Sequence, residues 1–252
     1  MIDNNVKDSA FTLAEVLITL GIIGVVAAMA IPNLITNTRF HQFRSKVKKT
    51  ISTLSQVARM SEAQYGFDYS GINQTCGSNA QDENPEETMS FCAMINGTLT
   101  GTTYYKKASN IKVKKNNTEE NYSITYNSSF FKGFQSLATL SAAFAYRLSD
   151  GTLIVVSSNL GKAVCTMDDT ATLSDNFNSG DMRWCAGFID VNGPDLPNTE
   201  VSCSRGTNSL SYNDCIVEND SEHLTDIYPI RFHDGVVEPA TAAGRYVLRT
   251  TK

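Results

Sequence analysis

The segment DVNGPDLPN, residues 190–198, has the clearest potential for metal chemistry. Asp190, Asn192 and Asp195 offer hard oxygen ligands at short spacing, Gly193 permits a tight turn, and calcium prefers oxygen clusters of this kind. The segment lacks the full twelve-residue calcium pattern and its closing Glu. A turn stabilised by hydrogen bonds of Asx side chains is the alternative, and we favour it.

Cysteine pairing is the second candidate chemistry. The chain has six cysteines, an even number, and they form no C-x-x-C pair of the kind that binds metals: Cys76, Cys92, Cys165, Cys185, Cys203 and Cys215. All six follow a long apolar segment, so we expect disulfides formed outside the cytoplasm; six buried free thiols are the alternative. Pairing each cysteine with its neighbour along the chain is a working hypothesis, one of fifteen possible connectivities.

Catalysis and nucleic-acid binding have little support. The three histidines, His41, His223 and His233, lie in no recognisable metal or triad motif, and the chain has no P-loop and no G-x-S-x-G. The net charge of −5 gives no global electrostatic case for binding nucleic acid. The lysines of YYKKASNIKVKK could grip a single strand beside Tyr104 and Tyr105, but a solvated hairpin end is the better interpretation.

One carboxylate lies within an apolar segment, AFTLAEVLITLGIIGVVAAMAIPNL, residues 10–34. Glu15 is the only charged residue from Phe11 to Ile31, and a helix of that length spans roughly 30 Å, the thickness of bilayer hydrocarbon. A buried core helix does not fit this length and all-round apolar character. An acid inside hydrocarbon is costly, and such residues are usually paired and functional.

A secretory signal peptide is another interpretation of this segment. Ala28 and Ala30 offer an A-x-A-like cleavage site that would start the mature chain at Ile31. Two observations oppose it. The leader carries Asp3, Lys7 and Asp8 and so lacks the usual positive character, and the apolar stretch exceeds the usual 7–15 residues.

The same segment resembles the N-terminal signature of type IV pilins and type II secretion pseudopilins. FTLAEV matches the F-T-L-x-E pattern of that family, although Ala10 stands where Gly is usual and the leader is not basic. The resemblance implies cleavage by prepilin peptidase between Ala10 and Phe11, then N-methylation of Phe11. Glu15 would be the fifth residue of the mature chain, able to neutralise the α-amine of a neighbouring Phe11 and set the register of subunits. The alternative is a Glu15 that snorkels to the headgroups without function.

The resemblance also implies where the chain resides. Five cations follow the segment, and the positive-inside rule alone would place them in the cytoplasm: Arg39, Arg44, Lys46, Lys48 and Lys49. The prepilin motif places them outside, and we follow the motif because it is more specific. We expect a single-pass inner-membrane protein with a cytoplasmic N-terminus, which later enters an extracytoplasmic filament in the periplasm or at the cell surface.

These features need a long helix to position them. Pro32 lies where relatives commonly kink and would bend or locally melt the helix. Beyond it, apolar residues recur at three- and four-residue steps, so the helix should resume and run to about Tyr65, ending at Gly66. The apolar stripe comprises Phe40, Phe43, Val47, Ile51, Leu54 and Ala58.

The sequence of the rest of the chain predicts many β-strands joined by long loops. TLTGTTYYKK, NYSITYN and CAGFIDVNG have strand composition, and hairpins are predicted at Asp150-Gly151 and Asp234-Gly235. The expected fold class is α+β and pilin-like: a long N-terminal helix, membrane-spanning in its first half, packed on a C-terminal antiparallel sheet. The expected divisions are a leader at 1–10, an apolar helix at 11–32, its amphipathic continuation at 33–66 and a globular domain at 67–252.

The resemblance adds a ligand and a set of partners. Some pseudopilins hold calcium in a C-terminal loop, and Asp226 matches the later Asp of that loop, so it joins Asp190, Asn192 and Asp195 as a candidate ligand. No cofactor is required. Expected partners are homologous pilin subunits in a helical filament, prepilin peptidase and an inner-membrane assembly platform. A membrane-tethered ligand-binding domain or enzyme that never polymerises is the alternative to a filament subunit.

Overall fold

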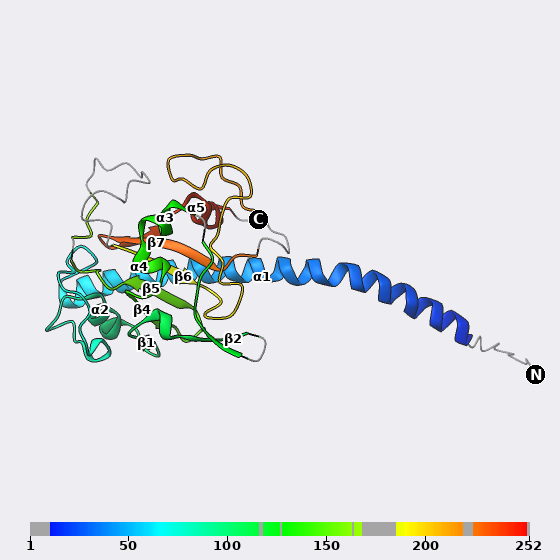
Figure 1. The fold of residues 1–252 in the computed structure, drawn as a ribbon, viewed down its shortest axis with the longest axis horizontal. Helices are drawn as coiled ribbons and strands as arrows, with labels where there is room; N and C mark the ends of the chain where they lie inside the picture. The colour runs from blue at the N-terminus through cyan, green and yellow to red at the C-terminus, as the bar shows by residue number, and fades with distance from the viewer. Residues whose placement is uncertain are drawn as a thin grey trace, which may run out of the picture.

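A computed structural model describes residues 11–115, 118–126, 128–162, 164–167, 185–218 and 224–250. One helix, α1 (Leu13–Tyr65), runs through a body of strands and short helices and projects far beyond it (Figure 1). The α+β architecture expected from the sequence is therefore confirmed.

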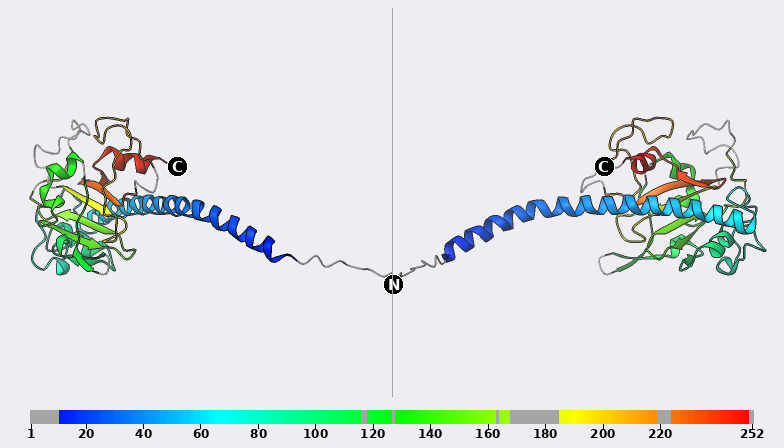
Figure 2. Two further views of the ribbon diagram at one scale, coloured as in Figure 1. Left: turned by 45° about the vertical axis from the view of Figure 1, so that its right-hand side comes forward. Right: turned by 180° about the vertical axis from the view of Figure 1, so that it is seen from behind.

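The projecting half of α1 is apolar on every side. Its segment Leu13–Ile31 has a mean hydropathy of 2.3, and none of it is buried within the chain. The helix continues through Pro32 without melting, and its projecting half curves away from the packed half (Figure 2). Proline removes one backbone donor, which bends a helix more readily than it ends one when both flanks are strongly helical.

The packed half of α1 presents one stripe to the body. Phe40, Phe43, Val47, Leu54 and Ala58 are buried, as the three- and four-residue spacing predicts, and Ile51 is half-buried. The helix ends at the position expected from the sequence: Gly66 adopts φ 79°, and its N–H donates to the carbonyl of Glu62. Glycine reaches this left-handed conformation without the steric penalty of a Cβ.

Two lysines on α1 connect the same half of the helix to loops at the ends of inner strands of the body, the turn at Asp150 and the loop that begins at Val191. Lys46 Nζ donates to the carbonyl oxygen of Val191 at 2.9 Å and to that of Asp150 at 3.4 Å. Lys49 Nζ lies 3.0 Å from a carboxylate oxygen of Asp150. The exposed ion pair contributes little stability, whereas the half-buried Lys46 satisfies two loop carbonyls.

The body is built on a six-stranded antiparallel sheet in the order β1-β4-β5-β6-β7-β8. Its strands are β1 (Thr103–Tyr105), β4 (Ala143–Arg147), β5 (Leu153–Ser157), β6 (Ala186–Asp190), β7 (Ile227–His233) and β8 (Val236–Pro239). Both hairpins predicted at Asp-Gly are present, β4–β5 and β7–β8. Gly151 at the first turn has φ 87°, and Asp234 at the second has φ 45°.

Both faces of this sheet are covered, which the sequence analysis did not predict. Phe144, Tyr146 and Ile154 belong to the core shared with α1, whereas Ala145 and Val155 belong to a second core on the opposite face. Alternate residues of a strand point to opposite faces, so a strand covered on both sides is apolar throughout. The second core is closed by phenylalanines of α3 (Ser129–Gly133) and the turn that leads into α4 (Gln135–Ala138).

The remaining elements are short. They are α2 (Phe91–Thr98), α5 (Ala242–Arg249), the 3-10 helices η1 (Ala80–Asp82) and η2 (Ala108–Asn110), and the hairpin β2 (Lys112–Lys115) with β3 (Thr118–Asn121). Helices α2 and α5 were not expected from the sequence. The strand expected over NYSITYN is wrong: β3 ends at Asn121, and beyond it Thr125 makes one isolated bridge to Thr199.

Candidate functional site

The carboxylate of Glu15 folds back on the first turn of α1. One of its oxygens accepts from the backbone N–H of Thr12 at 2.8 Å and from the Thr12 hydroxyl at 2.9 Å, while the Glu15 N–H donates to the same hydroxyl at 3.3 Å. This is a capping box, in which two side chains satisfy helix-terminal donors reciprocally. Thr12 was not singled out from the sequence, although the pattern T-L-A-E is the signature of such a box.

The capping box places the acid at the very start of the helix. The Glu15 carboxylate accepts from Thr12, the residue that follows Phe11, and Phe11 is 85% exposed. Ala10, and with it the scissile bond expected between Ala10 and Phe11, lies outside the described residues. If the chain were cut there, the carboxylate would already be oriented toward the end of the helix that carries the new amine.

The surface around Glu15 has no protein partner within the described chain. Leu17, Ile18, Ile22 and Ile23 are each about three-fifths exposed, and a Cβ added at Gly21 would meet no atom within 4 Å. Exposed apolar surface on this scale requires lipid or other helices as its environment. The helix is long and apolar enough to cross a membrane.

The six cysteines form three disulfides, Cys76–Cys92, Cys165–Cys185 and Cys203–Cys215. This is the nearest-neighbour pairing. Each bridge closes a short loop on the body, with sequence separations of 16, 20 and 12 residues. Constraining such loops lowers the entropy of the unfolded chain and stabilises the fold.

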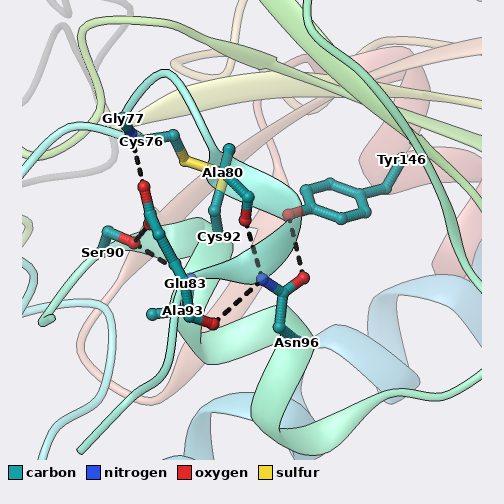
Figure 3. The surroundings of a disulfide bond; sticks show 9 residues. All are labelled: Cys76, Gly77, Ala80, Glu83, Ser90, Cys92, Ala93, Asn96 and Tyr146. Atoms are coloured by element: carbon teal, nitrogen blue, oxygen red, sulfur yellow. Dashed lines mark hydrogen bonds between the residues drawn. A yellow bond between two sulfur atoms is a disulfide. The ribbon is translucent and has the colours of Figure 1, made fainter. Parts of the chain in front are cut away.

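The bridge from Cys76 to Cys92 lies in a polar network that attaches α2 to the preceding loop (Figure 3). Glu83 accepts from the Gly77 N–H and from the Ser90 hydroxyl, and the Ser90 hydroxyl in turn caps α2 by accepting from the Ala93 N–H. Asn96 donates to the carbonyls of Ala80 and Glu83. With both sulfurs joined, this cluster is a structural support and not a metal centre.

Of the four candidate calcium ligands, the structure brings Asp190 and Asp226 together inside the body. Both are fully buried, Asp190 at the end of β6 and Asp226 just before β7. The Tyr122 hydroxyl donates to Asp190 at 2.6 Å, and the N–H groups of Asn198 and Thr199 donate to the two oxygens of Asp226. Tyr122 was not singled out from the sequence.

The other two candidates lie in the turn that follows β6. The Asn192 amide donates to the carbonyls of Asp195 and Leu196, and its N–H donates to the Asp190 carboxylate. Asp195 is exposed. Across the described residues, the carboxylates of Asp190, Asp195 and Asp226 do not all lie within 4.8 Å of one another. These are the Asx contacts of a stabilised turn, and calcium binding here stays a prediction.

Burial controls the protonation of the two inner acids. It raises the pKa of Asp226 to about 7, although the N–H groups of Thr199 and Asn198 favour the ionised form. Burial, followed by the nearby charge of Asp226, raises the pKa of Asp190 well above its ordinary value. Two carboxyl groups in such proximity resist ionising together.

The acid pair makes stability depend on pH. The folded pKa of Asp226 lies above the unfolded value of about 3.9, so its contribution is fully present below that value and lost as the pH rises toward 7. We expect the free energy of unfolding to fall across pH 4–7, with a slope on the order of 1 kcal/mol per pH unit. Thermal or urea unfolding followed by circular dichroism at several pH values measures this slope.

Two Asp→Asn variants isolate the acid pair from other titrating groups. Asp226→Asn removes one of the two titrating groups and should reduce the slope between pH 4 and 7, even if the lost hydrogen bond lowers stability at every pH; burial still raises the pKa of Asp190, which keeps part of the slope. Asp195→Asn, in the exposed turn, should leave the slope unchanged. An Asp226→Asn variant with the wild-type slope would show that Asp226 does not titrate in this range.

The lysine-rich segment is divided between the core and the surface. The ring of Tyr104 packs against those of Phe144 and Tyr146, at centroid distances of 6.1 and 5.2 Å. This ring is therefore part of the packing of the body. Lys106, Lys107 and Lys112 are exposed. The side chains of Lys114 and Lys115 lie outside the described set. This arrangement fits a solvated hairpin end more closely than a stacking platform for bases.

Comparison with known proteins finds a match for the N-terminal segment, which includes the first turn of α1. Residues 5–31 match a protein family described as the prokaryotic N-terminal methylation motif. No curated protein and no solved structure matches the chain significantly. The matched segment contains Phe11, Glu15 and the whole apolar span, and the structure joins it to an antiparallel sheet through one unbroken helix. The chain therefore carries a type IV pilin-like prepilin signature at its N-terminus.

Proposed function

We propose that this chain is a structural subunit of a filament of the type IV pilus or type II secretion kind. The membrane-spanning half of α1 first anchors the chain and then forms part of the filament core. Prepilin peptidase, an inner-membrane assembly platform and homologous subunits are the partners, and the subunit performs no chemistry of its own.

The observation that carries this proposal is an acid at the exposed tip of an apolar helix within the matched motif. Glu15 adds a charge that a simple membrane anchor does not need. In a packed filament it would neutralise the α-amine of a neighbouring Phe11, and the capping box presents the carboxylate at the correct end of the helix. Neither the exposed apolar surface of α1 nor its length conflicts with this use.

A tethered domain that never polymerises is the competing function, and imaging separates the two. A tagged copy of the chain should appear along or at the tip of fibres when cells that make such fibres are viewed by immunogold electron microscopy. A chain that is made and inserted but stays out of fibres, under conditions in which the fibres form, would support the tethered domain instead.

Processing should give a mature chain that begins with N-methylated Phe11. Mass spectrometry of the protein recovered from membranes measures this directly. Ala10→Leu, which places a bulky side chain beside the scissile bond, should leave the leader attached. A mature chain that begins at Ile31 would instead show that signal peptidase acts on the segment, and it would remove Glu15 altogether.

Calcium, if bound at the turn after β6, should stabilise the folded chain. A ligand that binds only the folded state raises the melting temperature as its concentration increases. The melting temperature should therefore be higher in millimolar calcium than in chelator, and Asp195→Asn should reduce the difference. Equal melting temperatures in calcium and chelator would rule out the site, and an equal rise in magnesium would show that the effect is not specific to calcium.

A further inference from the structure

A cavity of about 260 Å³ lies between α5 and the loop closed by the Cys203–Cys215 disulfide. Helix α5 and this loop lie side by side on the body (Figures 1 and 2). We call it the α5 cavity; its lining includes Tyr212, Cys215, Ala242, Arg245, Tyr246 and Arg249. Neither the prepilin motif nor the filament proposal assigns any role to it.

The walls of the cavity are fixed to each other. The Asn208 side chain accepts from the Ala243 N–H at 2.9 Å, and Arg245 donates to the carbonyl of Leu210 at 3.3 Å. The disulfide closes the loop at Cys215, which lines the cavity, and the Thr241 hydroxyl caps α5 by accepting from the Gly244 N–H. The cavity is therefore a preformed feature, which lowers the ordering cost of binding.

Two arginines, Arg245 and Arg249, line the cavity. Arg245 and Arg249 are four residues apart, so they lie on the same face of α5, where like charges repel. Among the described lining residues none is acidic, and the neighbouring Asp214 uses a carboxylate oxygen to accept from the Thr207 N–H.

Two tyrosines, Tyr212 and Tyr246, line the cavity beside the arginines. Tyr212 is 59% exposed, and Tyr246 is half-buried, packed against the main core. Phenol rings cover the flat or apolar face of a ligand and offer a hydroxyl at the edge, while guanidinium groups bind carboxylate and phosphate through paired hydrogen bonds. A volume slightly below the usual range of about 300–1,000 Å³ restricts the ligand to a small molecule or a terminal group.

We propose that the α5 cavity binds a small organic anion, a carboxylate or phosphate carried on a body the size of one sugar ring. Arg249, together with Arg245, holds the anionic group, and Tyr212 and Tyr246 contact the ring. The site does not depend on filament assembly, so it can be tested on the dispersed chain whether or not the chain polymerises.

Isothermal titration calorimetry of the 252-residue chain in nonionic detergent tests the proposal. The probes are glucuronate, glucose 6-phosphate, inorganic phosphate and neutral glucose. We expect saturable binding of at least one sugar anion and none of glucose. The tighter of glucuronate and glucose 6-phosphate identifies the anionic group, and weaker binding of inorganic phosphate shows that the ring contributes.

Three variants and one control locate the binding. Arg249→Gln and Arg245→Gln should each weaken binding at least about tenfold, the loss expected when a hydrogen bond to a charged group is removed. Tyr212→Ala should weaken it less. Arg147→Gln, at an exposed arginine on β4, should bind as the wild type does. Because Arg245 also supports the loop, its variant counts only if its melting temperature is unchanged; the exposed Arg249 provides the decisive comparison.

The proposal is overturned by any of three results. One is the absence of saturable binding by both sugar anions up to millimolar concentration. The second is equal binding of glucose and the sugar anions, which would remove the role of charge. The third is wild-type affinity in the Arg249→Gln variant, which would place the ligand elsewhere.

Discussion

Replacing Glu15 with Gln should stop filament growth or slow it severely, while membrane insertion and cleavage before Phe11 continue. Insertion should persist because the change removes a charge from hydrocarbon. Cleavage should persist because the residues next to the scissile bond are unchanged. Assembly should fail because the amine of a neighbouring Phe11 would be desolvated without its counter-charge, and breaking one side of a buried ion pair costs about 3–5 kcal/mol.

The capping box allows this charge to be separated from local helix stability. Gln at the third helical position can still close a capping box, so Glu15→Gln removes the charge and keeps the cap, whereas Glu15→Ala removes both. Thr12→Ala is the matched control, since it removes the capping hydroxyl and keeps the acid. We expect Thr12→Ala to assemble far better than Glu15→Gln.

Incorporation must be measured as well as fibre number. If the chain is a minor component, a mixed filament could tolerate some altered copies, so immunoblots of sheared fibres should accompany electron microscopy. Insertion, cleavage and wild-type incorporation of both Glu15 variants together would disprove the role in register. The tethered-domain function would then become the better explanation of the apolar helix.

Replacing Phe91 with Ala should lower the free energy of unfolding by about 3–5 kcal/mol, the range for truncating a fully buried phenylalanine. Phe91 is 0% exposed, and its ring neighbours include those of Tyr69, Phe144 and Phe232, with centroid distances of 6.2, 5.9 and 5.3 Å. These neighbours come from the segment after α1 and from two strands, so the cavity would form where separate elements meet.

Unfolding of the chain by denaturant, followed by circular dichroism, measures this cost. Phe91→Leu should lose much less, because most of the buried volume remains. A loss of less than about 1 kcal/mol for Phe91→Ala would mean that the surrounding rings collapse into the space, and that the aromatic cluster is not the stabilising centre of the body.

Local pattern predicted the features whose causes are local. The acid and apolar run around Glu15, the stripe from Phe40 to Ala58, the left-handed Gly66 and the turn at Asp150-Gly151 each depend on residues within a few positions of one another. Their geometry follows from the helix and strand periods and from the conformational freedom of glycine. The nearest-neighbour disulfides do not belong to this group: they join cysteines 12 to 20 residues apart, and the cysteine spacing alone left fifteen connectivities open.

Where distant contacts determine the structure, the sequence yielded either no prediction or a wrong one. NYSITYN alternates like a strand, but Tyr122 turns inward to Asp190, 68 residues away in sequence, and Ser128 N–H donates to Glu200. Helix α2 is a short apolar run that pattern alone does not distinguish from a strand. The pair of Asp190 and Asp226 exists because β6 and β7 are adjacent in the sheet, a register that no local signal specifies.

The unbroken α1 also determines how the molecule would respond to mechanical force. At about 1.5 Å per residue its 53 residues make a rod about 80 Å long, and Pro32 bends the rod without cutting it. A pull on the projecting half therefore travels along the rod to the stripe of Phe40, Val47 and Leu54. There it acts as shear, parallel to the interface, and all the packed side chains share the tension at once. The Lys46 bonds to two loop carbonyls connect the packed half of the rod to the body and would have to break before it could slide.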